Sequence, residues 1–223
     1  MRPWYHLAIL TIRLLARVFG GWRVTGVEHL PRSGAYIVAG NHISMFDPPL
    51  LGAALPVEAA FIAKAELFKN PLFGALLRSY NSIPVRRGEP DRQAIEHALE
   101  VLRGGRALAM FPEGTRDRLA RIRTPRRGLG LFAVQTGLPV VPAYIAGTNH
   151  FRRALIRQPR VTITFGPPFR PPAVDSDDPV ARRAAYDAVG VAWREALLAL
   201  EAAHARGESR RPGLRGGRAG REG

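Results

Sequence analysis

The chain has 223 residues, a length typical of one globular domain or of one domain with appendages. Hydrophobic residues make up 46% of it and charged residues 23%, which is enough apolar material for a core and excludes disorder throughout. The absence of cysteine excludes disulfides, cysteine-ligated zinc and thiol nucleophiles. The net charge of +15 points to an anionic partner, which could be nucleic acid, a membrane surface or an anionic substrate.

The N-terminal segment has the pattern of an interfacial helix. Residues 4–19 are mostly apolar but are interrupted by His6, Arg13 and Arg17, so they are too polar to span a bilayer. Together with Arg2, these residues form one basic stripe along a helix. The pattern predicts a helix over residues 1–22 that lies in a membrane interface with the stripe toward anionic headgroups. A helix packed on its own domain fits the same pattern equally well.

The middle of the chain alternates between predicted strands and helices. Short apolar or β-branched runs, most of them bordered by Pro, Gly or Asn, predict strands at residues 35–39, 60–63, 82–85, 107–111, 140–145 and 161–165. Helical spacing predicts helices at residues 91–103, 127–136 and 180–204. This alternation predicts one α/β domain over residues 23–205, with a mostly parallel sheet flanked by helices and functional loops at the strand ends.

A histidine and a carboxylate follow the first of these strands. The run Asn41–Pro48 contains His42 and, five residues later, Asp47. Residues five apart on a continuous helix point in different directions, so the two side chains meet only if the chain turns, and Pro48 disfavours a helical conformation at Asp47. A carboxylate that holds an imidazole fixes its tautomer, as a general base acting on a hydroxyl requires. On spacing alone, a local hydrogen bond without catalysis is the commoner arrangement.

A second polar run follows the predicted strand at 107–111. Residues 111–116 read FPEGTR. Gly114 allows a tight turn, and Thr115 and Arg116 offer a hydroxyl and a forked cation to an anionic oxygen. Glu113 is expected to orient an arginine or a substrate hydroxyl. Taken alone, the run also fits an ordinary turn with surface charges.

The C-terminal segment 206–223 is predicted to be a disordered tail. It contains six Arg and six Gly, but only two acidic residues and almost nothing to bury. Aromatic residues that could stack on bases are missing from it. We therefore expect no nucleic acid among the partners.

The motifs, taken in order, resemble the PlsC-like glycerolipid acyltransferases of the 1-acyl-glycerol-3-phosphate acyltransferase type. The likeness rests on an NHxxxxD block followed some seventy residues later by FPEGTR. Between and after these lie IPVR at residues 83–86 and LPVVP at residues 138–142, in the order found in that family. Two positions depart from the family. Asp117 replaces a residue that is often small and is expected to face solvent or pair with an arginine, while Arg126 keeps a cation but lacks the aromatic neighbour usual there.

The resemblance implies transfer of a fatty acyl group from acyl-CoA or acyl carrier protein to the sn-2 hydroxyl of 1-acyl-glycerol-3-phosphate, giving phosphatidic acid. His42 would be the general base and Asp47 would orient it. No metal and no resident cofactor are implied. The positions that match those binding the glycerol phosphate acceptor are Arg86, Glu113, Gly114, Thr115 and Arg116.

The expected partners are a lysophospholipid acceptor, an acyl donor and an anionic membrane surface. The expected location is the cytoplasmic face of the cell membrane, with peripheral or monotopic attachment. Two alternatives stay open: an acyltransferase for glycerol phosphate or another lysolipid, and a basic protein that binds membrane or nucleic acid without turnover. The second gives no reason to combine His42, Asp47 and Arg116, because a binding surface needs cations but no His–carboxylate pair.

Overall fold

One sheet of seven strands organises the computed structural model, which describes residues 3–86, 91–150, 160–174 and 178–209. The strand order is β1-β7-β6-β2-β5-β3-β4, and every neighbouring pair is parallel except β6 with β7. The predicted α/β class with a mostly parallel sheet is confirmed. The strands are β1 (Arg23–Thr25), β2 (Ile37–Gly40), β3 (Ala59–Lys64), β4 (Ser82–Val85), β5 (Ala107–Met110), β6 (Val140–Ala146) and β7 (Thr162–Phe165).

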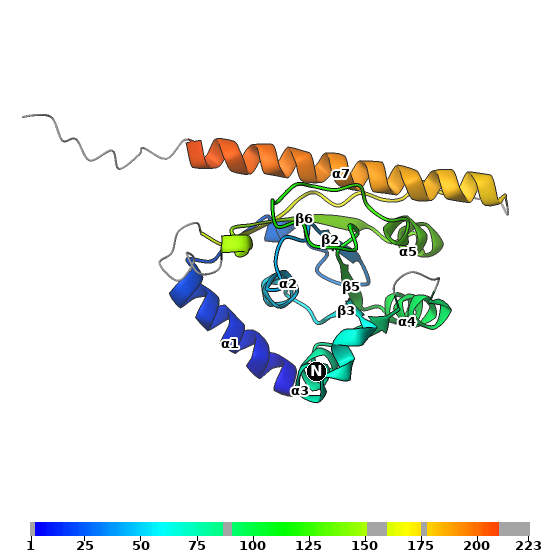
Figure 1. Cartoon of the computed structure of the whole chain (residues 1–223). Coiled ribbons are helices and arrows are strands. Elements are labelled where there is room, and N and C mark those ends of the chain that lie inside the picture. Colours follow the sequence, from blue (N-terminus) through cyan, green and yellow to red (C-terminus); the bar gives the residue numbers. More distant parts are fainter. Residues whose placement is uncertain (1–2, 87–90, 151–159, 175–177, 210–223) are drawn as a thin grey trace, which may run out of the picture.

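Helices cover both faces of this sheet (Figure 1). The α-helices are α1 (Pro3–Gly20), α2 (Asp47–Ala54), α3 (Pro71–Ser79), α4 (Arg92–Arg103), α5 (Gly128–Thr136) and α7 (Pro179–Ser209). Short 3₁₀ helices are η1 (Val27–His29), η2 (Ala65–Lys69) and η3 (Thr148–His150). In Figure 1, α7 runs along the top, α4 and α5 lie to the right of β5 and β3, and α1 and α2 lie to their left.

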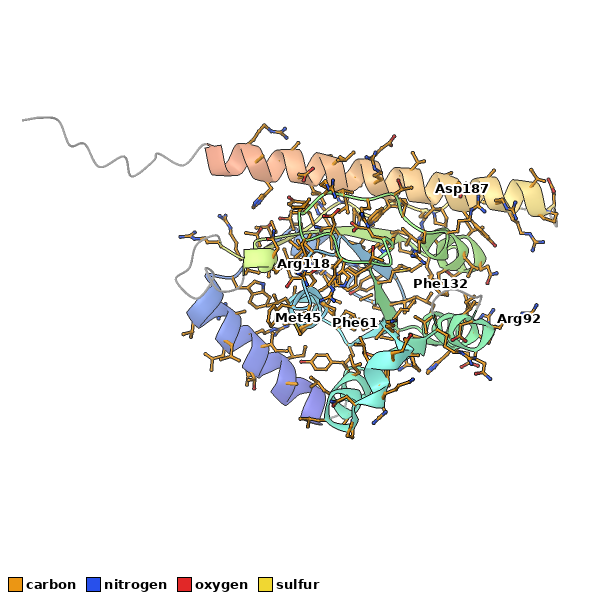
Figure 2. The ribbon with its side chains drawn as sticks, in the orientation of Figure 1. Met45, Phe61, Arg92, Arg118, Phe132 and Asp187 are labelled. Carbon is orange, nitrogen blue, oxygen red and sulfur yellow. The ribbon has the colours of Figure 1, made fainter. Side chains whose placement is uncertain are left out.

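Two hydrophobic cores fill the space between the layers, because successive strand residues point to opposite faces. In β2, Ile37 and Ala39 pack with residues of α4, α5 and α7, whereas Val38 packs with residues of α2. Phe132 and Phe61, labelled in Figure 2, belong to the first and the second core respectively. All residues of β2 and β5 are buried, as expected for strands covered on both faces.

All six predicted strands are present, with ends shifted by no more than two residues. The strand β1 was not predicted, because three residues are too few to show a period. The expectation for Pro48 was wrong: Asp47 is the first residue of α2, and Pro48 lies in the first turn of that helix. A proline is tolerated there because the N–H that it lacks would have no partner within the helix.

The helix α7 is held to the sheet by a buried tryptophan. Trp193 has no exposed surface, and its indole Nε1 donates a 2.9 Å hydrogen bond to the carbonyl oxygen of Ala39 in β2. The helix continues to Ser209, so the first four residues of the predicted tail are helical. The rest of that tail, residues 210–223, lies outside the described residues.

The helix α1 packs on α2, and its basic stripe is not turned uniformly outward. Arg13 donates from Nε to the carbonyl of Ala53 at 2.7 Å and from Nη2 to that of Leu55 at 3.2 Å. These carbonyls lie at the C-terminal end of α2, where a nearby cation stabilises the helix. Arg17 is exposed, and Arg2 lies outside the described residues. Large apolar side chains are exposed on α1 instead: Leu10, Leu14, Leu15 and Val18.

Among the described residues, no helix is both long enough and apolar enough to cross a membrane.

Candidate active site

The predicted site residues follow parallel strands and therefore lie along one edge of the sheet. His42 follows β2 and Glu113 follows β5, its neighbour in the sheet. Arg86 follows β4, two strands further from β5, which corresponds to about 10 Å at the usual strand spacing. The parallel topology thus places all three on the same edge, with Arg86 at its far end.

The chain turns after β2 and brings His42 and Asp47 together, as the sequence predicts. The Nδ1 of His42 lies 2.9 Å from Oδ2 of Asp47, and the backbone N–H groups of Ile43 and Ser44 each donate to the same oxygen at 2.7 Å. The ionised carboxylate can only accept, so Nδ1 carries the proton and Nε2 keeps its lone pair. Asp47 has no exposed surface, and the His42 side chain is 14% exposed. The imidazole is therefore both oriented and accessible.

Two residues that the sequence analysis did not assign hold this pair in place. Asn41 is buried; its Nδ2 donates to the carbonyl of Ile145 at 2.9 Å, and its Oδ1 accepts from the Ile145 N–H at 2.7 Å. These bonds join the end of β2 to β6. Thr148 is also buried and donates from Oγ1 to Oδ1 of Asp47 at 2.6 Å. Asn41 adjoins His42 and could have been singled out, whereas Thr148 has no local signal.

The loop after β5 is attached to the His42 turn at two points. The ring of Phe111 stacks on the imidazole, with centroids 4.3 Å apart and an interplanar angle of 25°. The backbone N–H of Asp117 donates to the carbonyl oxygen of His42 at 2.8 Å. The FPEGTR run therefore lies directly against the histidine.

Glu113 is a buried carboxyl group without a hydrogen-bond partner among the described residues. Its side chain is almost fully buried, and neither carboxyl oxygen is bonded. Burial raises the pKa of Glu113 to about 7, and the nearby Asp117 carboxylate adds to the rise. The backbone N–H groups of Arg123 and His42 lower the pKa in part, although neither forms a hydrogen bond of good geometry with the carboxyl group. The expectation that Glu113 orients an arginine is not met by any hydrogen bond among the described residues.

Asp117 pairs with arginines and does not face solvent. It is 5% exposed, and its Oδ2 lies 3.3 Å from Nε of Arg121 and 3.1 Å from Nε of Arg123. Burial alone would raise the pKa of Asp117, but the Leu119 N–H and the two guanidinium groups outweigh it and lower the pKa below its usual value. The acidic departure from the family pattern is thus a carboxylate that orders the loop.

The remaining predicted residues differ in how closely they approach the histidine. Gly114 has a φ of +70°, and a Cβ there would lie 2.6 Å from Nε of Arg126, so the turn favours glycine. Thr115 accepts a 3.3 Å hydrogen bond from Arg123, and Arg116 is exposed. Arg86 pairs with Asp91, through its backbone N–H at 2.9 Å and its Nε at 3.4 Å. The FPEGTR run therefore contacts the His42 ring through Phe111, while Arg86 is engaged by Asp91.

No group of three or more His, Asp or Glu side chains that could hold a metal ion occurs within residues 3–86, 91–150, 160–174 and 178–209. The LPVVP run has a backbone role in the described structure. The carbonyl of Pro139 accepts from Ile37 at 3.0 Å, and that of Pro142 accepts from Gly166 at 2.9 Å.

Known proteins share both the sequence pattern and the fold. The sequence model of a family described as Acyltransferase matches residues 21–146. The chain is 27% identical to the 1-acyl-sn-glycerol-3-phosphate acyltransferase of Bacillus subtilis, over 74% of this chain and 81% of that protein. It is 31% identical to the protein of the same name from Limnanthes douglasii, over 79% of this chain and 66% of that one.

The structure is similar to the crystal structure of the 1-acyl-sn-glycerophosphate acyltransferase PlsC from Thermotoga maritima. The TM-score is 0.58 at 28% identity, with 87% of this chain and 83% of that chain covered. Since the family match spans more than half of the residues and includes both polar runs, the chain belongs to the acyltransferase family.

Proposed function

We propose that the protein transfers a fatty acyl group from an acyl thioester to the sn-2 hydroxyl of 1-acyl-glycerol-3-phosphate, giving phosphatidic acid. The observation that carries the proposal is the His42–Asp47 pair at the carboxyl edge of the sheet, in contact with the FPEGTR loop. The names of the relatives from Bacillus subtilis and Limnanthes douglasii support the choice of acceptor.

In this mechanism, Nε2 of His42 removes the proton from the acceptor hydroxyl as its oxygen attacks the thioester carbonyl. The carbon–sulfur bond then breaks, and the departing thiolate takes the proton from the imidazolium. Asp47 keeps Nδ1 protonated and stabilises the imidazolium. No acyl-enzyme forms, so no thiol nucleophile is needed. The donor is acyl-CoA or acyl carrier protein, and no metal or resident cofactor takes part.

The FPEGTR loop would bind the acceptor. Thr115 and Arg116 offer a hydroxyl and a forked cation to the phosphate, Gly114 allows the turn, and the Glu113 carboxyl faces the glycerol unit. Arg86 would reach the phosphate from the far end of the edge after leaving Asp91. Holding the phosphate in this way presents the hydroxyl to His42.

Peripheral or monotopic attachment to the cytoplasmic face of the membrane follows from the same proposal, since the acceptor lies in a leaflet and the thioester donor is supplied from the cytoplasm. Exposed leucines support this arrangement, because contiguous apolar surface marks interaction sites. Helices α1 and α3 lie along the lower edge of the molecule in Figure 1. The exposed side chains there are Leu10, Leu14, Leu15 and Val18 of α1, Leu67 of η2, and Leu72 and Leu76 of α3.

The experiment measures thioester consumption with a panel of acceptors and identifies the lipid product. His42→Ala should lower kcat with 1-acyl-glycerol-3-phosphate by about 100- to 10,000-fold, while His97→Ala, an exposed histidine of α4, should not. Unchanged CoA release by His42→Ala would refute the mechanism. Faster transfer to glycerol phosphate or another lysolipid would identify that compound as the acceptor. No thioester consumption with any acceptor would favour a binding protein.

A further inference from the structure

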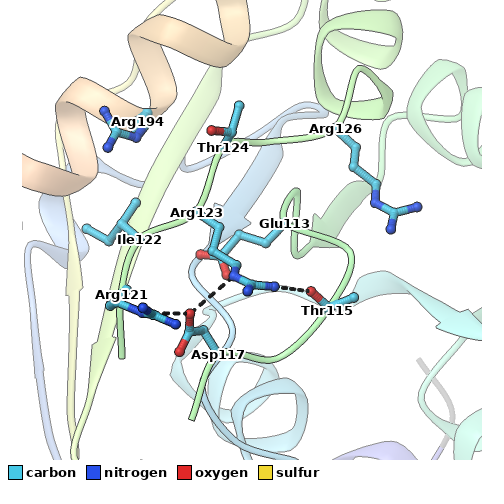
Figure 3. Close-up of a pocket in the computed structure, with 9 residues that line it drawn as sticks. All are labelled: Glu113, Thr115, Asp117, Arg121, Ile122, Arg123, Thr124, Arg126 and Arg194. Carbon is cyan, nitrogen blue, oxygen red and sulfur yellow. Dashed lines mark hydrogen bonds and ion pairs between the residues drawn. The ribbon is translucent and has the colours of Figure 1, made fainter. Parts of the chain in front are cut away.

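An open cavity of about 620 Å³ lies between the loop after β5 and α7 (Figure 3). The loop provides Arg121, Arg123 and Arg126, and α7 provides Arg194. Glu113 also lines the cavity. Both walls of the cavity thus carry guanidinium groups, and one wall carries a buried carboxyl group.

The charges of the cavity do not cancel within the protein. Asp117 is neutralised by Arg121 and Arg123. Within the described residues, Arg126 and Arg194 have no acidic partner, and Glu113, whose pKa is about 7, offers at most one negative charge and has no hydrogen-bond partner. The cavity is therefore suited to an anion.

The cavity adjoins the turn that carries the proposed base. The backbone N–H of its lining residue Asp117 donates to the carbonyl of His42 at 2.8 Å. In 1-acyl-glycerol-3-phosphate only a few covalent bonds separate the phosphate from the sn-2 hydroxyl, whereas the phosphates of acyl-CoA lie at the far end of the pantetheine arm from the thioester. A phosphate bound next to this turn therefore fits the acceptor.

The position of Arg194 is fixed by its neighbour. Trp193 is fully buried and bonded to Ala39 near the end of β2, two residues before Asn41. The register of α7 against the sheet thus places Arg194 in the lining of the cavity. This helix lies beyond residues 21–146, the part that matches the family model.

We propose that Arg194 is a specificity-determining residue, which extends the phosphate site of the FPEGTR loop from α7 in the cavity that it lines together with Thr115, Arg123 and Arg126. The inference rests on the proposed acyl transfer to a phosphate-bearing lysolipid. It adds a residue from outside the FPEGTR loop and makes recognition of the phosphate depend on how α7 docks on the sheet.

The test compares Arg194→Gln with Arg183→Gln. Arg183 is exposed on the same helix, eleven residues earlier, and so points in nearly the same direction about 16 Å away. Arg194→Gln should raise KM for 1-acyl-glycerol-3-phosphate by about 10- to 100-fold and leave KM for acyl-CoA unchanged. Arg183→Gln should change neither KM, and Arg194→Lys should restore part of the affinity.

A second measurement does not depend on turnover. Glycerol 3-phosphate should raise the unfolding temperature of wild type and of Arg183→Gln, but much less that of Arg194→Gln. An unchanged acceptor KM together with an unchanged thermal shift would overturn the inference, and so would a rise confined to the acyl-CoA KM, which would place the donor phosphates here. Absence of acyl transfer by the wild type would instead contradict the proposed function. In that case the thermal shift would still show whether Arg194 takes part in phosphate binding.

Discussion

The hydroxyl of Thr148 donates a 2.6 Å hydrogen bond to Oδ1 of Asp47, across 101 residues of sequence. The other carboxylate oxygen receives His42 and two backbone N–H groups. Both oxygens of Asp47 are thereby held, one by its own turn and the other by the segment after β6. The orientation of the imidazole thus depends on two distant parts of the chain.

Replacing Thr148 with valine should lower kcat about tenfold and leave KM for both substrates unchanged, because a hydrogen bond to a charged group contributes about 1.5 to 3 kcal/mol. Thr148→Ser keeps the hydroxyl and should recover most of the rate. Thr136→Val is the matched control, since the Thr136 hydroxyl donates within α5 and accepts from the Leu138 N–H, with no bond to the His42 turn. Steady-state kinetics measures kcat and KM of the three variants. A serine variant as slow as the valine variant would show that loss of the hydroxyl does not cause the fall in kcat.

Replacing Glu113 with glutamine should stabilise the protein increasingly as the pH rises. The pKa of Glu113 is raised from 4.5 to about 7, so between these values the folded protein holds a proton that the unfolded chain releases, and the wild type loses stability with rising pH. Glutamine does not titrate. Near pH 8 the variant should gain about 1 to 2 kcal/mol in the free energy of unfolding, and near pH 4 it should gain almost nothing.

Denaturant unfolding at several pH values measures this difference. Glu100→Gln, at an exposed position of α4, serves as the control and should show no such trend. A stability difference that is the same at every pH would contradict the raised pKa of Glu113.

Charges placed on the exposed face of α1 should weaken membrane binding. Leu10 and Leu14 are 64% and 61% exposed, so Leu10→Glu with Leu14→Glu should leave the fold intact. Co-sedimentation with anionic phospholipid vesicles should fall at least tenfold, because the variant loses apolar contact and gains repulsion. Val191→Glu, at an exposed position of α7, should bind like wild type. Equal sedimentation of all three proteins would reject the α1 surface as the membrane contact.

Replacing Arg13 with methionine should loosen α1 from the domain. The change keeps an apolar stem but removes both hydrogen bonds to the last carbonyls of α2, at a cost of about 1 kcal/mol. Hydrogen exchange in α1 should accelerate. Arg17→Met, one turn further along at an exposed position, should leave exchange unchanged, and equal rates in both variants would show that Arg13 does not anchor the helix.

Much of the fold could be predicted because its strands are short apolar runs with clear borders. The run at residues 82–85, for example, coincides with β4. The spacing leaves the contact between His42 and Asp47 open, and the family resemblance implies it. The expectation for Pro48 was wrong: Asp47 begins a helix, and its side chain points back over the preceding turn.

Other parts of the site depend on long-range contacts that leave no local pattern. Thr148 meets Asp47 only because β6 lies next to β2, and Arg194 reaches the cavity only because Trp193 docks α7 on Ala39. Arg86 shows the converse. Its motif grouped it with the FPEGTR run, yet its strand is at the end of the sheet and its guanidinium is engaged by Asp91.

The short helix α2 connects the turn that carries His42 to helix α1. Its first residue is Asp47, and its last carbonyls are held by Arg13 of α1. Eight residues of helix measure about 12 Å. Helix α1, which carries the exposed leucines, and the Asp47 carboxylate, which orients His42, therefore lie at opposite ends of one short helix. In the proposed membrane-bound protein, a shift of α1 would therefore act on the turn that carries His42, and the depth of α1 in the lipid would influence the geometry of proton transfer.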